Sequence, residues 1–365
     1  MPDADDHRFM SLALALGRRG LGNAWPNPAV GAVVVKDGIV VGRGWTQPGG
    51  RPHAEAQALR RAGEAARGAT IYATLEPCSH HGKTPPCVDA IIAAGIARVV
   101  SAIEDPNPKV AGQGHARLTA QGIAVDVGLG AEEARRAHAG HIRRVRDGRP
   151  HVILKLAVSS DGKVALAGRK PARITGEPAT ARVHLMRATS DAVLTGIGTV
   201  LADDPQLTCR LPGMAHRSPV RVVLDSALRL PPGSRLSTSA AQTLTWAFAG
   251  EATPAGTERP LADLGVEVLR VPGAEGRLDL AAVLGTLSER GITRVMVEAG
   301  PIVSAAFLAA DLVDAAALFR SPNAIGEGID AFDGMPLTAL TQSPRLRLVR
   351  SDQIGADRLD TFERS

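Results

Sequence analysis

Apolar residues recur along the chain in short runs separated by amphipathic stretches, a pattern that predicts alternating strands and helices. In the first half, the runs at 30–35, 39–44, 69–75, 97–103 and 123–127 predict strands, and Asp37-Gly38 predicts a hairpin turn between the first two. Helical spacing is found at 1–20, 54–67, 87–94, 110–121 and 132–146. Strands alternating with helices are typical of a layered α/β unit with a largely parallel sheet.

The same alternation restarts after the polar, turn-rich residues 147–150, where we place a boundary between domains 1–147 and 148–365. The chain of 365 residues exceeds the ~250–300 at which a single core stops growing, which also favours two domains. Residues 231–256 carry the weakest pattern. The second half predicts strands at 151–158, 192–195, 220–224, 244–248, 266–271 and 294–298, and helices at 179–188, 278–289 and 302–310.

The composition indicates a globular, cytoplasmic protein. Hydrophobic residues make up 44% and charged residues 22%, an ordinary balance that excludes a disordered or fibrous chain. We expect no membrane span, because no run of 18 apolar residues occurs, and no signal peptide, because Asp3, Asp5 and Asp6 stand where one would be basic. Three cysteines make no disulfide framework and fit a reducing compartment.

The charge balance bears on the class of ligand. The net charge is +5 and the pI about 9.5, a mild excess that fits a phosphorylated small molecule at least as well as a nucleic-acid duplex. Aromatic residues are only 3% of the chain, which argues against a single-strand binder built on stacking platforms. We expect a small-molecule partner and no nucleic acid.

Three residues of the first half have the chemistry of a zinc site. His53, Cys78 and Cys87 offer one imidazole and two thiolates, a donor set that prefers zinc and leaves a fourth position for water. A catalytic zinc lowers the pKa of that water towards ~7. Glu55, two residues after His53, reaches the same cavity without being a ligand, and we expect it to carry a proton from the water to a leaving amine.

The order H-x-E…P-C…C matches the signature of zinc deaminases, except that eight residues separate the cysteines instead of two. Other interpretations stay open. Free cysteines are most often small buried hydrophobes, as we expect for Cys209. A structural zinc in a non-catalytic interaction module would need four protein ligands, and only three are evident.

Four segments of the first half, 25–31, 53–55, 74–87 and 105–108, carry a family resemblance. They resemble the bifunctional riboflavin-biosynthesis deaminase/reductases, in which the eight-residue spacing is usual. The resemblance implies a cytidine-deaminase-like three-layer α/β/α domain followed by a dihydrofolate-reductase-like α/β domain, with Zn2+ and NADPH as cofactors. It implies deamination of a diaminopyrimidinone ribosylamino phosphate and then reduction of its ribosyl chain to ribityl.

The resemblance also implies substrate contacts in the first half. Asn27 would hydrogen-bond the pyrimidine or ribose, and His80 and Lys83, in the loop between the cysteines, would bind the ribose phosphate. The chain departs from the family near Thr46, where a His is frequent, and at Arg51, where a Glu is frequent.

A nicotinamide site is only weakly signalled by the residues of the second half. Gly196-Ile-Gly198 lacks the third glycine of a dinucleotide fingerprint. Residues 155–162, 195–205, 207–210, 223–226 and 297–301 are similar to the reductase half of the family. Carried over from it, the cofactor residues are Ala157, Arg173, Thr199, Asp203, Ser226, Gly300, Pro301, Ile302, Val303, Ser304, Ala305 and Ala306. The substrate residues are Pro171, Arg187, Leu207, Arg210 and Glu298, with the arginines pairing bidentately with the phosphate.

Two rival functions remain beside the bifunctional enzyme. Pro171 and Arg173 stand where the family carries a Ser and a Trp, and the segment after Val313 differs too, so the second half could be a degenerate reductase. Alternatively, the first half is an RNA-acting zinc deaminase, which only the pI supports. The family resemblance further implies a homo-oligomer.

Overall fold

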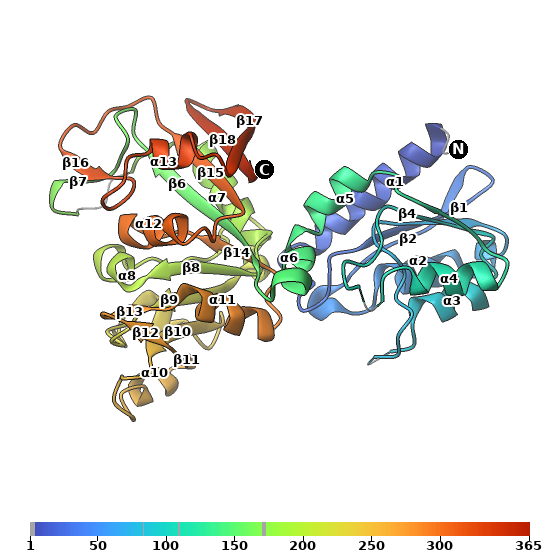
Figure 1. Ribbon diagram of the computed structural model, residues 1–365, viewed down its shortest axis with the longest axis horizontal. Helices are drawn as coiled ribbons and strands as arrows, with labels where there is room; N and C mark the ends of the chain where they lie inside the picture. The colour runs from blue at the N-terminus through green and yellow to red at the C-terminus, as the bar shows by residue number, and fades with distance from the viewer. Residues whose placement is uncertain (1–3, 83, 109, 170–172) are drawn as a thin grey trace. The chain divides into compact units, whose positions relative to one another are not determined.

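The computed structural model describes residues 4–82, 84–108, 110–169 and 173–365, and the chain divides into two compact units, Met1–Arg149 and Pro150–Ser365 (Figure 1). The division falls inside the turn-rich segment 147–150. Among the described residues, no helix has both the length and the apolar character needed to cross a bilayer.

The N-terminal unit is built on a five-stranded sheet in the order β2-β1-β3-β4-β5. β1 runs antiparallel to β2 and β3, whereas β3, β4 and β5 are parallel. Helices α1 and α5 lie on one face and α2, α3 and α4 on the other, giving three layers (Figure 1). The elements are α1 Ala4–Gly17, β1 Gly31–Lys36, β2 Ile39–Trp45, α2 Ala54–Ala62, β3 Thr70–Ala73, α3 Cys87–Ala93, β4 Arg98–Ser101, α4 Gln113–Ala120, β5 Ala124–Val127, α5 Ala131–Ala137 and α6 Ala139–Asp147.

Two glycines allow the helices to approach this sheet closely. A Cβ on Gly31 of β1 would lie 1.9 Å from the Ala13 carbonyl oxygen of α1, and one on Gly44 of β2 would lie 2.2 Å from the Ala54 oxygen of α2. Neither position accepts a larger residue without moving a helix. Close packing on both faces buries the sheet in one apolar core and places the start of α2 beside the strand ends.

The C-terminal unit has a nine-stranded sheet in the order β11-β10-β9-β8-β14-β6-β15-β18-β17. Its strands are parallel from β11 to β15, and β18 and β17 complete it as antiparallel strands. The strands are β6 His151–Val158, β8 Ala192–Gly196, β9 Val220–Leu224, β10 Thr245–Gly250, β11 Val266–Val271, β14 Arg294–Val297, β15 Ala315–Arg320, β17 Leu346–Ile354 and β18 Asp357–Arg364.

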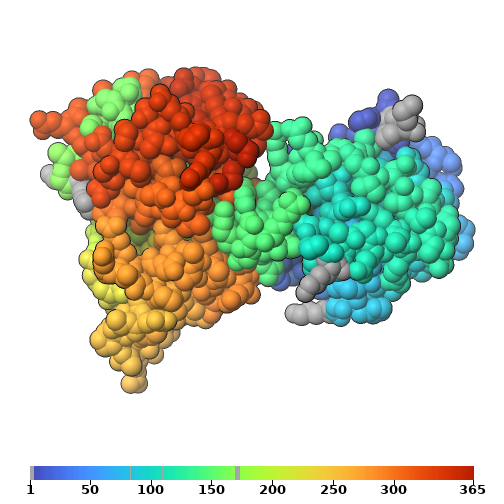
Figure 2. Space-filling view, in the orientation of Figure 1, coloured from blue at the N-terminus to red at the C-terminus, as the bar shows by residue number. Residues whose placement is uncertain are grey.

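The helices and two small two-stranded sheets of this unit lie in the segments between the strands of the large sheet. In Figure 2 the red C-terminal residues lie at one end of the unit and the gold residues around α10 at the other, as the strand order requires. The helices are α7 Glu177–Ala188, α8 Ile197–Asp203, α9 Arg235–Thr238, α10 Arg259–Ala262, α11 Leu280–Glu289, α12 Pro301–Ala309 and α13 Thr338–Thr341. The hairpin pairs β12 Gly273–Ala274 with β13 Arg277–Leu278, and the second small sheet pairs β7 Lys163–Leu166 with β16 Gly328–Asp330.

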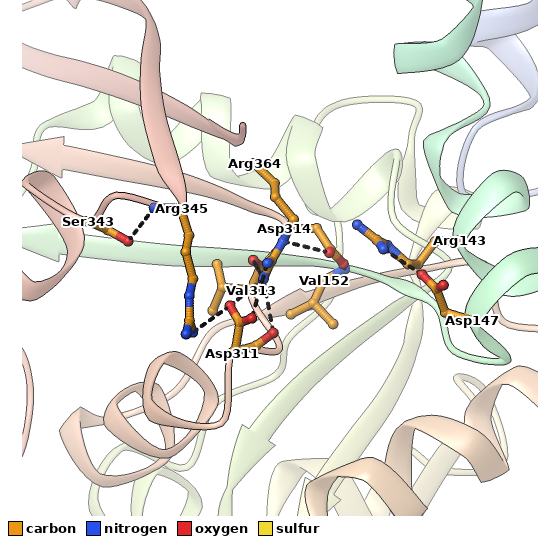
Figure 3. A network of polar contacts seen from close by, with 9 residues as sticks. All are labelled: Arg143, Asp147, Val152, Asp311, Val313, Asp314, Ser343, Arg345 and Arg364. Atoms are coloured by element: carbon orange, nitrogen blue, oxygen red, sulfur yellow. Dashed lines mark hydrogen bonds and ion pairs between the residues drawn. The ribbon is translucent and has the colours of Figure 1, made fainter.

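The last fifty residues form strands that the apolar pattern did not indicate. β18 is held where it ends by Arg364, whose Nη2 donates to the Asp311 carboxylate at 2.7 Å and to the Val313 carbonyl at 2.8 Å (Figure 3). Asp314 accepts from the backbone N–H of Val152 at 2.9 Å, which fixes the start of β6 beside β15. The bond between Val152 and Asp314 joins segments 162 residues apart in the chain.

One expected helix differs in the structure. The single helix predicted at 132–146 is two helices, α5 and α6, which meet at His138. The His138 ring lies 3.0 Å from the Thr74 hydroxyl, so this junction is tied to the end of β3.

Candidate active sites

The three zinc-ligand candidates of the N-terminal unit come from three separate places in the chain and meet at one point. His53 stands at the N-cap of α2, Cys78 lies in the turn after β3, and Cys87 begins α3. The His53 Nδ1 atom lies 3.3 Å from the Cys87 sulfur and 3.7 Å from the Cys78 sulfur. The three ligand atoms all lie within 4.8 Å of one another, so the structure brings the predicted set together.

The donor set fits Zn2+ in chemistry as well as in spacing. One imidazole nitrogen and two thiol sulfurs converge, as in catalytic sites that use three protein ligands. Hydrogen bonding from Cys87 and then from His53 lowers the pKa of the Cys78 thiol to about 4, although burial opposes this. The contact with Cys78 and burial raise the pKa of Cys87 well above its ordinary value. Without a metal, Cys78 therefore loses its proton more readily than Cys87, whereas a bound Zn2+ would hold both cysteines as thiolates.

Glu55 lies in the first turn of α2, and its side chain is buried, with 4% of the residue exposed. Burial raises the pKa of its carboxyl group, and the neighbouring His53 partly offsets that rise. A carboxyl group with a raised pKa, next to a metal site, can both accept and release a proton near neutral pH.

The expected substrate residues of this unit differ in their placement. The Asn27 amide nitrogen lies 3.3 Å from His53 Nε2, the ring nitrogen opposite the thiols, and donates to the Gly50 carbonyl at 2.9 Å. His80 is exposed in the loop between the cysteines, and Lys83 lies outside the described residues. Arg51 donates to the Thr84 hydroxyl, so this departure from the family pattern puts a guanidinium against the same loop.

The C-terminal unit gathers its candidate residues along the carboxyl edge of the parallel strands, where open α/β sheets bind ligands. Ser226 follows β9, Thr199 lies in α8 after β8, and Glu298 follows β14. Since β9, β8, β14 and β6 are neighbours in the sheet, these positions share one edge with Ala157 near the end of β6.

The centre of this edge is a charged cluster around Glu298. Arg187, which is 8% exposed, donates through Nε to Oε2 and through Nη2 to Oε1 of Glu298, both at 2.9 Å. Lys155 on β6 approaches Oε1 at 3.3 Å. Burial alone would raise the pKa of Glu298, but the cations Lys155 and Arg187 outweigh it and lower that pKa to about 2.

This pairing differs from the expectation that both arginines bind phosphate bidentately. The remaining Nη1 of Arg187 donates to the Thr208 carbonyl at 3.0 Å, so its guanidinium is engaged by protein groups. The Arg210 backbone N–H donates to His184 Nδ1 at 3.3 Å, which holds Arg210 beside the same loop, next to the buried Leu207. Burial and the nearby Arg187 lower the pKa of Arg210.

Some of the expected cofactor residues meet at the start of α12, and the others lie apart from it. The Gly300 N–H donates to the Thr199 hydroxyl at 3.2 Å, which joins α12 to α8. Ser226 donates through its hydroxyl to the Gly276 carbonyl at 2.7 Å. Asp203 is exposed, and Arg173 pairs with Glu177 at 3.6 Å; Pro171 lies outside the described residues. The remaining positions, Pro301, Ile302, Val303, Ser304, Ala305 and Ala306, form the first turns of α12.

Lys155 is the site residue that the sequence reasoning did not single out. A signal was available, because it is the one charged residue in the apolar run 152–158. It lies two positions before Ala157, so both side chains leave β6 on the same face.

Two family models match the chain, one in each unit. "Cytidine and deoxycytidylate deaminase zinc-binding region" matches residues 3–103, and "RibD C-terminal domain" matches residues 150–359. The first contains His53, Cys78 and Cys87, and the second contains the Glu298 cluster.

Curated relatives match over nearly the whole length. The riboflavin biosynthesis protein RibD of Escherichia coli is 43% identical, covering 96% of this chain and 97% of its own. That of Aquifex aeolicus is 40% identical, with 98% of both chains covered.

Solved structures of similar proteins match the fold of this chain over both units. RibD of Acinetobacter baumannii, in its form 1, matches with a TM-score of 0.87 at 38% identity, with 99% of each chain covered. A diaminohydroxyphosphoribosylaminopyrimidine deaminase/5-amino-6-(5-phosphoribosylamino)uracil reductase of Thermotoga maritima matches with a TM-score of 0.85 at 37% identity and 98% coverage of each. The α/β folds expected from the sequence are those of these proteins.

Proposed function

The chain belongs to the RibD family of riboflavin-biosynthesis enzymes, with a zinc-dependent deaminase and an NADPH-dependent reductase, and we propose which of its residues perform the two reactions. We assign the deaminase to residues 1–147 and the reductase to 148–365. As substrates we propose those in the name of the Thermotoga relative: the diaminohydroxyphosphoribosylaminopyrimidine, and the phosphoribosylaminouracil that its deamination yields.

We assign His53, Cys78 and Cys87 as the zinc ligands and Glu55 as the proton carrier. Bound Zn2+ would supply the Lewis acid that activates water for attack on the ring carbon bearing the amine. Glu55 takes a proton from that water through its carboxylate and returns it to the departing amine nitrogen. The observation that carries this assignment is the convergence of the three ligand atoms within 4.8 Å, with the buried Glu55 two residues after His53 in the first turn of α2.

For the reductase we assign the substrate pocket to the cluster of Lys155, Arg187 and Glu298. NADPH would supply the hydride. Addition of hydride to C1′ of the opened ribosyl chain must be matched by one proton on the attached nitrogen. Lys155 Nζ is a donor within this cluster, and the Glu298 carboxylate holds it at 3.3 Å. Thr199, Ser226 and the start of α12 would line the cofactor.

We assign the substrate phosphate in this pocket to Arg210. No hydrogen bond or ion pair joins its guanidinium to another of the described residues, whereas Arg187 is engaged by Glu298 and Thr208. A free guanidinium suits bidentate recognition of phosphate. The complete Glu298 cluster also favours a working reductase over a degenerate one.

The remaining proposals concern binding partners, oligomeric state and cellular location. We propose that the enzyme acts on small molecules without nucleic acid, is a homo-oligomer, and works in the cytoplasm, where thiol ligands stay reduced. The aromatic content of 3% supports the first proposal. Light scattering on the purified protein tests the oligomer, and tRNA titration at two salt concentrations tests the absence of nucleic-acid binding.

A coupled assay tests both reactions together. Zinc-loaded protein is given the diaminopyrimidine substrate and NADPH, and ammonia and NADPH absorbance are followed in one cuvette. Ammonia release followed by NADPH loss is expected. Ammonia without NADPH loss would refute the reductase assignment, and no ammonia from protein with zinc bound would refute the deaminase substrate.

A further inference from the structure

The turn that carries Cys78 begins at a buried carboxylate that the proposed reaction does not use. Glu76 lies two residues before Cys78 and is 5% exposed. Its backbone N–H donates to the Ile103 carbonyl at 2.9 Å, which extends the contact between the two chain segments past the ends of β3 and β4. A buried charge is costly unless it is fully hydrogen-bonded, so its partners define its role.

Four backbone N–H groups from one segment converge on the Glu76 carboxylate. Oε2 accepts from Asp105 at 3.0 Å and from Gly112 at 2.9 Å. Oε1 accepts from Gly114 at 2.8 Å and from His115 at 3.4 Å. Hydrogen bonds to an ionised acceptor are about twice as strong as neutral ones, so this is a firm attachment.

Three of these donors belong to the start of α4. Gly112 is its N-cap, and Gly114 and His115 lie in its first turn, where the N–H groups have no partner within the helix. The negative carboxylate also faces the positive end of the helix dipole. Glu76 therefore caps α4 from another part of the chain.

The fit between α4 and the Cys78 turn is close. A Cβ on Gly114 would lie 2.3 Å from the Pro77 carbonyl oxygen and 3.0 Å from Glu76 Oε1. On the other side of the turn, the Cys78 carbonyl accepts from Val88 at 3.2 Å and its sulfur accepts from the Cys87 N–H at 3.2 Å. The path of Cys78 is thus held by α4 through Glu76 and by α3.

We propose that Glu76 is a positioning residue for the zinc ligand Cys78: by fastening the start of α4 and the Asp105 turn to the Glu76–Cys78 segment, its carboxylate sets where the Cys78 sulfur stands relative to His53 and Cys87. The inference rests on the proposed zinc site. It predicts that the charge at residue 76 governs zinc affinity and ligand geometry, without Glu76 touching metal or substrate.

Glu76→Gln tests this directly, because it keeps the size of the side chain but turns one acceptor oxygen into a donor facing backbone N–H groups. We expect zinc affinity, measured by competition with a chromophoric chelator, to fall 10- to 100-fold, as for other residues that orient metal ligands. The Co2+-loaded variant should show a weakened thiolate-to-cobalt absorption band. Glu76→Asp, which restores the carboxylate, should recover part of both.

The matched control is Glu104→Gln, which removes the same charge at an exposed position beside Asp105. It should bind zinc as the unsubstituted protein does. Reductase turnover, measured on the deaminated substrate, should be unchanged in all variants. Gly114→Ala is a second variant that pushes α4 from the Cys78 turn while leaving Glu76 in place, and it should also weaken zinc binding.

The alternative is that Glu76 only stabilises the fold. In that case Glu76→Gln would lower the unfolding temperature but leave zinc affinity and the cobalt spectrum unchanged, which overturns the inference. Failure of both Glu76→Gln and Gly114→Ala to fold, with Glu104→Gln intact, would overturn it as well. If the unsubstituted protein binds no zinc, the proposed zinc site is refuted, and the inference that rests on it is refuted too. If the unsubstituted protein and Glu76→Gln both bind zinc with the same high affinity, only the inference about Glu76 is refuted.

Discussion

Arg187 and Glu298 form an ion pair with two parallel hydrogen bonds, Nε to Oε2 and Nη2 to Oε1, each of 2.9 Å. Arg187 comes from α7 and Glu298 follows β14, so the pair joins a helix to the carboxyl edge of the sheet. Lys155 approaches the same carboxylate from β6. One buried anion thus holds two cations in the proposed reductase pocket, which makes it the best point for testing that pocket.

Glu298→Gln should abolish NADPH oxidation while leaving ammonia release unchanged. It should also lower the free energy of unfolding of the C-terminal unit by about 3 kcal/mol, because removing one partner of a buried pair leaves the other charges uncompensated. Urea unfolding at pH 7 measures the second effect. An unchanged reductase rate would contradict the assignment of the pocket.

The pH dependence of this effect follows from the pKa of Glu298, which falls from its ordinary 4.5 to about 2 in the folded protein. A lowered pKa in the folded state means that stabilisation by the carboxylate is complete above pH 4.5 and is lost as the pH falls towards 2. The stability difference between the unsubstituted protein and Glu298→Gln should therefore be constant from pH 5 to 8 and shrink below pH 4.5. A difference that already shrinks at pH 6 would contradict the ion pair.

Glu55→Gln should lower the deaminase kcat by about 10²- to 10⁴-fold, the range attributed to a positioned proton carrier. Zinc content should stay at the level of the unsubstituted protein, because Glu55 is not a ligand. Metal analysis and an ammonia assay are made on the same sample. The control is the rate at which the same sample oxidises NADPH when it is given the deaminated substrate. Zinc loss in step with activity would instead make Glu55 a structural support of the metal site.

Removal of zinc by a chelator should stop ammonia release and leave the reductase reaction intact, since the candidate ligands all lie in the N-terminal unit. Adding Zn2+ back should restore deamination. Cys78→Ser should show the same loss without recovery at micromolar zinc, because the thiolate ligand is gone. Deamination that persists in metal-free protein would refute the zinc assignment.

Asp6→Asn should destabilise the N-terminal unit by about 2 kcal/mol, because the hydrogen bonds to its charged carboxylate are weakened while Arg98 keeps Asp126 as a partner. Asp6, 3% exposed, accepts from both terminal nitrogens of Arg98 at 2.8 and 3.0 Å and from the Tyr72 hydroxyl at 2.6 Å, so it ties α1 to β3 and β4. Thermal unfolding followed by circular dichroism measures the loss. The control is Asp5→Asn, whose exposed pair with Arg8 at 3.6 Å should contribute less than about 1 kcal/mol.

Much of the site chemistry is encoded locally and could be predicted from the sequence. His53 and Glu55 stand two residues apart at a helix start, and Cys78 and Cys87 follow a strand and begin a helix, so residue types and spacing already indicate a zinc deaminase. The alternating α/β pattern is likewise a local property, because the spacing of apolar residues within each segment indicates whether that segment forms a strand or a helix. The resemblance to the family then supplied the substrate class and the reductase.

Tertiary structure decided the features that depend on partners distant in the chain. Glu298 and Arg187 are 111 residues apart, and no local pattern says that Arg187 meets a carboxylate rather than a phosphate. The strands β17 and β18 went unrecognised because they are partly exposed and gain their regularity from pairing with β15 and with each other. In the sequence, Glu76 is one acidic residue within a motif, and only the folded structure shows that four backbone N–H groups surround its carboxylate. A sequence specifies the residues that carry chemistry, whereas the energy of burying a charge is set by neighbours that only the fold brings together.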